Sequence, residues 1–356
     1  LEAGQKDTCY EMQVECREGA YCGGSWKGIM DKLDYISGMG FDAIWISPIV
    51  NNTECGYHGY WMKHLHELND RMGTASDLKL LVDTAHSKGI MVMFDGVLNH
   101  VGPKSRGSRP SDFNEYAPLN KAKYFHGGWK LATLDGTEKE ECEHFNFSTF
   151  NLSLGHCQVK CAPDQYFREA CWLGERDGQL PDLRQEDPTV ERLLIDQVKK
   201  DLSKFKFDGL RLDSAAYMNK TFLHKIKTEA LEDTYTVADV ALEAPTEFFA
   251  SYQYTEEARF IQSLVSKEEI RRIKADHIHG DVVDGILNYE LFNALRKAFI
   301  SKAVEADNEK RYDRDNAQGS FLDLKYKWLK LNSTYHDVGS NMNFIDSHDQ
   351  RRWFYD

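Results

Sequence analysis

Short apolar runs alternate with amphipathic segments along most of the chain. In 28–38, 74–88 and 189–206 the apolar residues recur at helical spacing, whereas 41–48 and 90–94 are continuous apolar runs typical of buried strands. A strand, a helix and a further strand in this succession indicate parallel β/α units. This part of the sequence therefore predicts helices packed on a parallel sheet.

The same succession continues towards the C-terminal end. Further strands are predicted at 207–213, 234–240, 282–287 and 342–345, and further helices at 220–232, 256–275 and 289–299. Six strands with intervening helices predict an α/β fold, a (β/α)8 TIM barrel, whose active site lies at the carboxyl ends of the strands. The pattern shows neither a first nor a last barrel strand, so both are expected to be missing.

This rhythm is interrupted between residues 102 and 180. The segment is rich in Gly, Pro, Asn and aromatic residues and holds half of the cysteines. It predicts an irregular, disulfide-linked domain inserted between a strand and its helix. The domain organisation expected is a barrel formed by 1–101 and 181–356, with the inserted domain at 102–180.

The composition is that of a globular protein with an acidic charge balance. Of the 356 residues, 41% are hydrophobic and 28% are charged, and the formal net charge is −13. A nucleic-acid partner would need a basic face, so none is expected, and a neutral polymer fits this charge better. No apolar run reaches the roughly 18 residues of a membrane span, so none is expected. We expect a monomer.

Cysteines and glycosylation sequons predict passage through an oxidising compartment. The eight cysteines lack the CxxC pairs typical of zinc sites, which favours disulfides over metal ligation. Asn-x-Ser/Thr sequons begin at Asn51, Asn146, Asn151, Asn219 and Asn332. Together with the even cysteine count they predict a secreted glycoprotein. The chain shows no signal peptide and begins at Leu1, as a processed or truncated product would.

Four segments carry the candidate chemistry. The predicted strand 207–213 contains Arg211 and ends on the carboxylate of Asp213. The other three segments are Asp95-Gly96-Val97-Leu98-Asn99-His100, Tyr57-His58-Gly59-Tyr60-Trp61 and Phe344-Ile345-Asp346-Ser347-His348-Asp349. A lone Arg-x-Asp at a strand end is usually a structural ion pair, but four segments in this order resemble the α-amylase family, glycoside hydrolase family 13. Between residues 21 and 102 the chain is similar to fungal-type secreted α-amylases.

The resemblance implies a role for each of these side chains in retaining glycoside hydrolysis. Asp213 is the expected nucleophile, Arg211 is expected to keep it ionised by charge pairing, and Asp349 is the expected third acid. Tyr60 is expected to stack on the sugar at the cleavage point. The other side chains that the resemblance places around that sugar are His58, Trp61, His100 and His348.

The general acid is left open between two residues. A retaining enzyme needs a carboxylic acid about 5–5.5 Å from its nucleophile. The family places a Glu at the end of the fifth barrel strand. Spacing puts Asp239 at that position, whereas Glu243 has the right side chain but lies four residues later. An Asp is one methylene shorter, and a displacement of about 1 Å can lower a rate on the order of 100-fold.

A second departure from the family follows the expected nucleophile. Many fungal-type enzymes carry Lys-His on the leaving-group side, where this chain has Ala216-Tyr217. The loss of both donors is expected to weaken binding on that side and to change the product pattern or the choice of substrate.

The resemblance also implies a structural calcium site and one disulfide. Calcium prefers oxygen ligands, and the family's side-chain ligands correspond to Asn99 and Asp182. Backbone carbonyls near Glu169 and Tyr217 are expected to complete the cage and to tie the inserted domain to the barrel. The disulfide implied in the inserted domain is Cys157–Cys171.

The function implied is hydrolysis of internal α-1,4-glucosidic bonds, with a starch- or glycogen-type α-glucan as partner and Ca²⁺ as cofactor. The alternative is a catalytically degenerate module that binds glycans or serves in assembly, and the altered acid favours it. An α-glucosidase or transglycosylase of the same superfamily would differ only in its subsites. Family members normally continue into a C-terminal β domain, which is missing here, so a fragment of a longer protein is expected.

Overall fold

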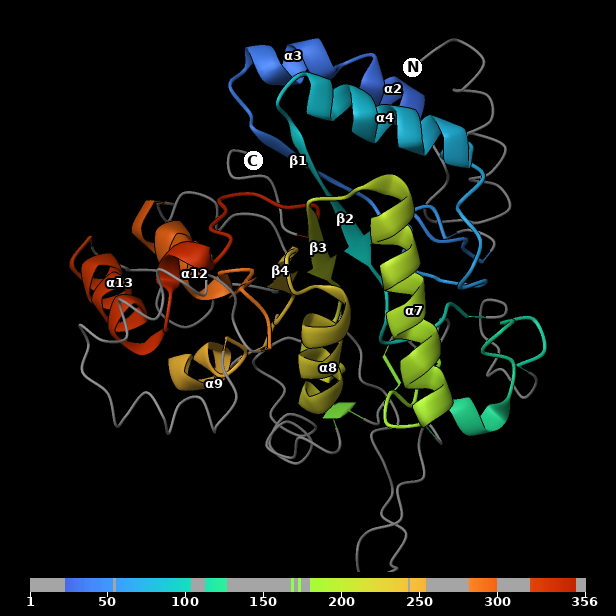
Figure 1. The fold of residues 1–356 in the computed structure, drawn as a ribbon. Helices are drawn as coiled ribbons and strands as arrows, with labels where there is room; N and C mark the ends of the chain where they lie inside the picture. The colour runs from blue at the N-terminus through green and yellow to red at the C-terminus, as the bar shows by residue number, and fades with distance from the viewer. Residues whose placement is uncertain are drawn as a thin grey trace, which may run out of the picture.

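One parallel sheet forms the centre of the structure. The computed structural model describes residues 23–53, 56–103, 113–126, 168–169, 172–173, 180–242, 244–253, 282–299 and 321–349. Within these residues, neighbouring strands in the sheet are also neighbours in the chain, and all of them pair in parallel. The strands are β1 (Ala43–Ile46), β2 (Met91–Gly96), β3 (Gly209–Leu212), β4 (Tyr235–Ala238) and β5 (Gly285–Ile286) (Figure 1).

The two faces of this sheet have different surroundings. Met93, Val237 and Leu287 form a small apolar cluster on one face. Val92 and Leu210, which lie at alternate positions, belong to the larger core beneath the helices. Successive side chains of a strand point to opposite faces, so this alternation follows from the strand geometry. The face of the small cluster is also the one that carries the candidate site.

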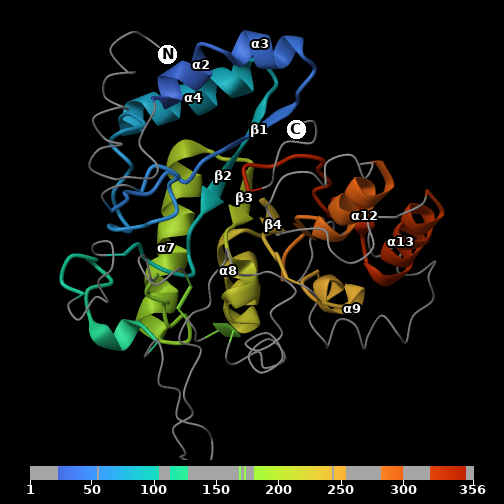
Figure 2. The same cartoon turned by 180° about the vertical axis from the view of Figure 1, so that it is seen from behind.

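Helices cover the other face and the edges of the sheet. Their bounds are α2 (Trp26–Met30), α3 (Leu33–Gly38), α4 (Ala75–Ser87), α7 (Pro188–Phe205), α8 (Lys220–Ala230), α9 (Thr246–Ala250), α12 (Tyr289–Phe299) and α13 (Phe321–Thr334). Figures 1 and 2 show α2, α3 and α4 gathered at the β1 end, α7 beside α8, and α9, α12 and α13 grouped beyond β4. No helix in the described part of the chain combines the length and the apolar character that a bilayer crossing requires.

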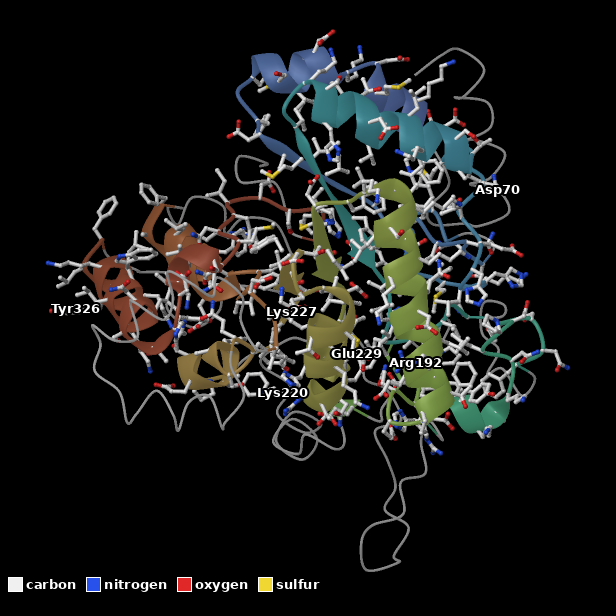
Figure 3. All side chains as sticks on the ribbon, viewed as in Figure 1. Asp70, Arg192, Lys220, Lys227, Glu229 and Tyr326 are labelled. Atoms are coloured by element: carbon white, nitrogen blue, oxygen red, sulfur yellow. The ribbon has the colours of Figure 1, made fainter. Side chains whose placement is uncertain are left out.

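Polar side chains join these helices to one another and to the sheet. Arg192 of α7 donates to Glu229 of α8 at 3.1 Å, and both are labelled in Figure 3. Lys227, also on α8, is buried and donates from Nζ to Asp284 at 2.7 Å, just before β5. The carboxylate of Asp284 also accepts from the backbone N–H of Thr236 in β4. This buried ion pair therefore ties α8 to two strands.

Most of the predicted elements are confirmed within the described residues. The segment predicted as one helix over 28–38 is two helices, because a turn at Asp31–Lys32 separates α2 from α3. Helices α9 and α13 were not predicted. In α13 only Leu331 is buried, so its apolar residues do not form the one-sided stripe that identifies a helix in a sequence. The helix predicted over 256–275 lies outside the described residues.

The strand predicted over 342–345 is wrong. Met342 forms a single parallel bridge with Leu287, and the chain then leaves the sheet. The reason is packing, because the ring of Phe344 stacks on Phe292 of α12, with ring centroids 4.8 Å apart. The side chain of Phe344 is thereby partly buried against this helix, and no further ladder forms over the described residues 343–349.

Candidate active site

Arg211 lies at the centre of the candidate site, and the register of the strands explains its neighbours. In the ladder Asp95 of β2 pairs with Arg211 of β3, which pairs with Val237 of β4. Residues paired across a parallel ladder point to the same face, as do residues two positions apart in one strand. Asp213 and Asp239, each two positions beyond a member of this row, therefore point towards the same guanidinium.

The guanidinium contacts three carboxylates. Its Nη1 donates to both oxygens of Asp95, at 2.8 and 3.1 Å, and to Oδ1 of Asp213 at 2.7 Å. Its Nη2 donates to Oδ2 of Asp239 at 2.5 Å. The hydroxyl of Ser214 donates to the second oxygen of Asp213 at 2.9 Å. Arg211 is only 1% exposed, so these charges interact in surroundings with little water.

Aromatic rings form one side of the cluster. The hydroxyl of Tyr60 donates to Oδ2 of Asp95 at 2.7 Å and lies 3.0 Å from Nε2 of His348. The indole N–H of Trp45 donates to the same oxygen of Asp95 at 3.2 Å. The guanidinium carbon of Arg211 lies 5.3 Å from the Trp45 ring centroid and 5.5 Å from that of Tyr60, within the range of cation–π attraction.

Burial makes ionisation of two of the carboxyl groups harder. Desolvation raises the pKa of Asp95 to about 7, although the charge of Arg211 opposes the shift. Desolvation likewise raises the pKa of Asp239 to about 6, against Arg211 and with help from the charges of Asp213 and Asp349. Three carboxylates share one guanidinium, and an uncompensated buried negative charge favours protonation.

The histidines expected around the sugar lie close to Tyr60. Nδ1 of His58 accepts the backbone N–H of Tyr60 at 3.0 Å, and its ring meets that of Trp61 edge to face at 4.9 Å. Nε2 of His100 lies 3.1 Å from the carbonyl oxygen of Tyr60. His348 stacks on Tyr60 with ring centroids 5.9 Å apart. Burial lowers the pKa of His58 to about 4, so this imidazole is neutral at ordinary pH.

The remaining acids differ in how they are placed. Asp349 is half-exposed and lies 3.3 Å from Nε2 of His348, and its charge helps to raise the pKa of Asp239. Glu243 lies outside the described residues. Asp239, one of the two candidates for the acid, lies in the cluster with the expected nucleophile, Asp213.

Two of the predicted calcium ligands, Asn99 and Asp182, contact each other. Asn99 donates from its side-chain amide to Oδ1 of Asp182 at 2.9 Å, and both side chains are buried. Oδ1 of Asn99 is buried without a hydrogen-bond partner, as an oxygen meant for a cation would be. Nδ1 of His126 lies 2.7 Å from Oδ2 of Asp182. No group of three or more His, Cys, Asp or Glu suited to a metal ion occurs in the described ranges.

The other two expected contributors to this cage were backbone carbonyls near Glu169 and Tyr217. The carboxylate of Glu169 accepts from the side chain of Asn219 at 2.9 Å. Ala216 and Tyr217 are 3% and 2% exposed, in a short 3-10 helix that follows β3. With both side chains buried, this pair offers a sugar neither of the donors that Lys-His would supply.

Asp95 and Trp45 were not given a role from the sequence. Asp95 directly follows the predicted strand 90–94, which was its signal in the sequence, and its pairing with Arg211 came from the structure. Trp45 lies within a continuous apolar run, where periodicity does not reveal which side chains face the site. Only the tertiary structure shows which group accepts the hydrogen bond of its indole N–H.

These features describe a parallel β/α protein whose acids are gathered around an arginine at the carboxyl ends of its strands. Over residues 3–355 the chain matches the family profile described as "Alpha amylase, catalytic domain". The chain belongs to the α-amylase family.

Known relatives extend the comparison. The chain is 32% identical over 339 residues to "Alpha-amylase 1" of Schwanniomyces occidentalis, covering 94% of this chain and 52% of that protein. It is 40% identical over 223 residues to an α-amylase of Saccharomycopsis fibuligera, covering 61% and 39% of the two chains. It therefore spans about half of the first relative and less of the second.

Solved structures confirm the fold class. An α-amylase from Malbranchea cinnamomea superimposes with a TM-score of 0.69 at 27% identity, over 94% of this chain and 56% of that one. The α-amylase from Geobacillus thermoleovorans complexed with acarbose gives a TM-score of 0.60 at 26% identity, over 89% and 54%. The predicted α/β fold of the (β/α)8 type is confirmed, and the described strands contribute one continuous parallel part of it.

Proposed function

We propose that this protein hydrolyses internal α-1,4-glucosidic bonds of starch- or glycogen-type glucans with retention of configuration. One observation carries the proposal. Two acids from neighbouring strands, Asp213 and Asp239, bind different nitrogens of the same guanidinium, that of Arg211. A retaining glycosidase needs two carboxyl groups held close together in opposite protonation states, and the charge of Asp213 beside Asp239 raises the pKa of Asp239.

Asp213 is the proposed nucleophile. Its two oxygens accept hydrogen bonds from Arg211 and from the hydroxyl of Ser214, at 2.7 and 2.9 Å. Donors to both oxygens hold this carboxyl group in one orientation, from which it would attack the anomeric carbon. Asp349 is proposed to hydrogen-bond to sugar hydroxyls beside His348 and to favour the distorted transition state.

Asp239 is the proposed general acid, with Glu243 kept as the alternative. One oxygen of Asp239 accepts from Arg211, and the other, Oδ1, is buried and makes no hydrogen bond. A proton on Oδ1 would not be engaged by another described residue, and its transfer to the glycosidic oxygen requires the substrate to reach this buried atom. Burial and nearby negative charge raise the pKa of Asp239 to about 6, which supports a protonated fraction at mildly acidic pH.

Calcium is proposed as a structural cofactor held by Asn99 and Asp182, with backbone carbonyls near Glu169 and Tyr217. The buried, unpaired Oδ1 of Asn99 beside the carboxylate of Asp182 supports this site. A bound cation would neutralise the buried charge of Asp182 and link the segments on either side of the proposed inserted domain, 102–180.

A secretory route, disulfides and glycosylation are also proposed. The cysteines, including Cys157–Cys171, lie outside the described residues. Asn219 is a poor glycan acceptor because its side chain caps α8 and bonds to Glu169. Asn332 is exposed on the last turn of α13, so it is the better candidate. A monomer without a nucleic-acid partner stays a prediction.

The test is hydrolysis of soluble starch by the full-length protein, compared with Asp239→Asn and Glu243→Gln variants. We expect the parent to release reducing ends, Asp239→Asn to lose this activity and Glu243→Gln to keep it. Loss in Glu243→Gln alone would transfer the role of the acid to Glu243. A parent that binds starch without cleaving it would overturn the hydrolase and favour the glycan-binding module.

A further inference from the structure

We propose that Trp45 of β1 is a positioning residue for the reaction. It holds the guanidinium of Arg211 and the ring of His348 in the arrangement on which the acids depend. The proposal rests on the proposed function of the same site. It concerns a residue that lies outside all four sequence segments in which the candidate chemistry was found.

The indole N–H of Trp45 orients Asp95, the carboxylate that binds the guanidinium of Arg211. This N–H donates to Oδ2 of Asp95 at 3.2 Å, beside the hydroxyl of Tyr60, which donates to the same oxygen at 2.7 Å. Asp95 in turn accepts from Nη1 of Arg211 through both oxygens. With two neutral donors on its carboxylate, Asp95 is held in one orientation while it orients Arg211.

The ring of Trp45 also contacts Arg211 and His348 directly. The guanidinium carbon of Arg211 lies 5.3 Å from the centroid of the indole ring, a distance at which a cation is attracted by an aromatic face. The ring of His348 meets the indole edge to face, with centroids 5.5 Å apart and an interplanar angle of 73°. His348 is thereby held between Trp45 and Tyr60, on which it stacks.

This arrangement matters because one guanidinium orients both catalytic acids. Asp213 is bound to Nη1 and Asp239 to Nη2, so a rotation of Arg211 would displace the two carboxyl groups together. Displacement of a reacting group by about 1 Å can lower a rate on the order of 100-fold. Trp45 opposes that rotation from a strand, which holds a side chain more precisely than a loop does.

The experiment compares Trp45→Phe and Trp45→Leu with Trp328→Phe, a control on the exposed side of α13. Hydrolysis of maltoheptaose and the melting temperature are measured for each. Phe keeps a ring beside Arg211 and His348 but loses the N–H donor, whereas Leu loses both. We expect kcat to fall roughly 10-fold in Trp45→Phe and roughly 100-fold in Trp45→Leu, with smaller changes in KM. Trp328→Phe is expected to match the parent.

The pH profile separates positioning from a merely structural role. The titratable groups that face Asp239 are Arg211, Asp213, Asp349, Tyr217 and Tyr289. Of these, the guanidinium of Arg211 opposes the rise in the pKa of Asp239 that burial causes. In Trp45→Phe the guanidinium is held less firmly beside Asp239, so the pKa of Asp239 is expected to rise and the basic limb of the kcat profile to move to higher pH.

Several results would overturn the proposal. One is parent-like kcat in both Trp45 variants, and another is a loss explained entirely by a lower melting temperature with an unmoved pH profile. If the parent does not cleave maltoheptaose, the proposed function fails, and maltoheptaose affinity replaces kcat as the readout. Weaker binding in Trp45→Leu but not in Trp328→Phe then supports the positioning role. Unchanged binding, or no binding by any variant, overturns it.

Discussion

Nη2 of Arg211 donates to Oδ2 of Asp239 across two adjacent strands, at 2.5 Å, while Nη1 of the same guanidinium holds Asp213. The pairing leaves Oδ1 of Asp239 buried and without a hydrogen-bond partner. One guanidinium thus connects Asp239, the proposed acid, to Asp213, the proposed nucleophile.

Replacement of the nucleophile is expected to separate activity from folding. Asp213→Asn keeps the shape of the side chain but removes the attacking charge, so turnover of starch should fall by roughly 10³-fold or more. Circular dichroism should remain that of the parent. Asp83→Asn, which alters an exposed ion pair on α4, is the control and should leave turnover unchanged. Full activity in Asp213→Asn would exclude this residue as the nucleophile.

The activity of the parent is expected to fall as pH rises through about 6. Asp239 must be protonated to act as the acid, and burial raises its pKa to about that value. Asp349→Asn removes a negative charge that helps to raise this pKa, so the basic limb of its kcat/KM profile should move to lower pH. A basic limb that does not respond to Asp349→Asn would place the acid elsewhere, as at Glu243.

The raised pKa of Asp239 also affects the stability of the folded protein. Because the pKa of Asp239 is higher in the folded protein than its ordinary value, this group stabilises the fold at acidic pH. That contribution should decrease as pH rises from about 4 through about 6. Comparing urea unfolding of the parent and of Asp239→Asn across this range measures it.

Removal of calcium is expected to lower the stability of the folded protein. With free Ca²⁺ about 100-fold above its Kd, binding would contribute about 2.7 kcal/mol, which a chelator would remove. The melting temperature of the parent should fall on chelation, whereas an Asn99→Ala variant should respond much less. A melting temperature that chelation leaves unchanged would contradict the calcium site.

Breaking the buried ion pair of α8 is expected to be costly. Lys227→Met would leave the carboxylate of Asp284 buried without its cation and lower the free energy of unfolding by about 3–5 kcal/mol. Lys79→Met removes an exposed ion pair with Asp83 and should cost less than about 1 kcal/mol. Urea unfolding of both variants makes the comparison. Equal losses of unfolding free energy in the two variants would show that burial does not determine how much an ion pair contributes.

Close packing at β5 predicts a second sensitive position. A Cβ added at Gly285 would lie 1.9 Å from the carbonyl oxygen of Ser340, so Gly285→Ala should destabilise the fold by about 3 kcal/mol or more. At Gly38, on the last position of α3, a Cβ would meet nothing within 4 Å, and Gly38→Ala should change stability by less than about 1 kcal/mol. A tolerated Gly285→Ala would mean that the 338–342 segment can move away from the sheet.

Local chemistry in the sequence was enough to predict the β/α succession and the segments that carry the site. An apolar run such as 90–94 that alternates with amphipathic helical segments is typical of a buried parallel strand, and a carboxylate at the end of such a strand lies at the functional edge of the sheet. The positions of Arg211 and Asp213 two residues apart also predict that both side chains face the same way.

Only the tertiary structure decided how these residues combine. Strand register brought Asp95 and Asp239 to the same guanidinium, and register depends on packing between segments far apart in the chain. The chain leaves the sheet after Met342, and the ring of Phe344 stacks on Phe292 of α12. The hydrogen-bond acceptor of the Trp45 indole was also decided by the tertiary structure, since periodicity indicates burial but not the partner of a buried polar group.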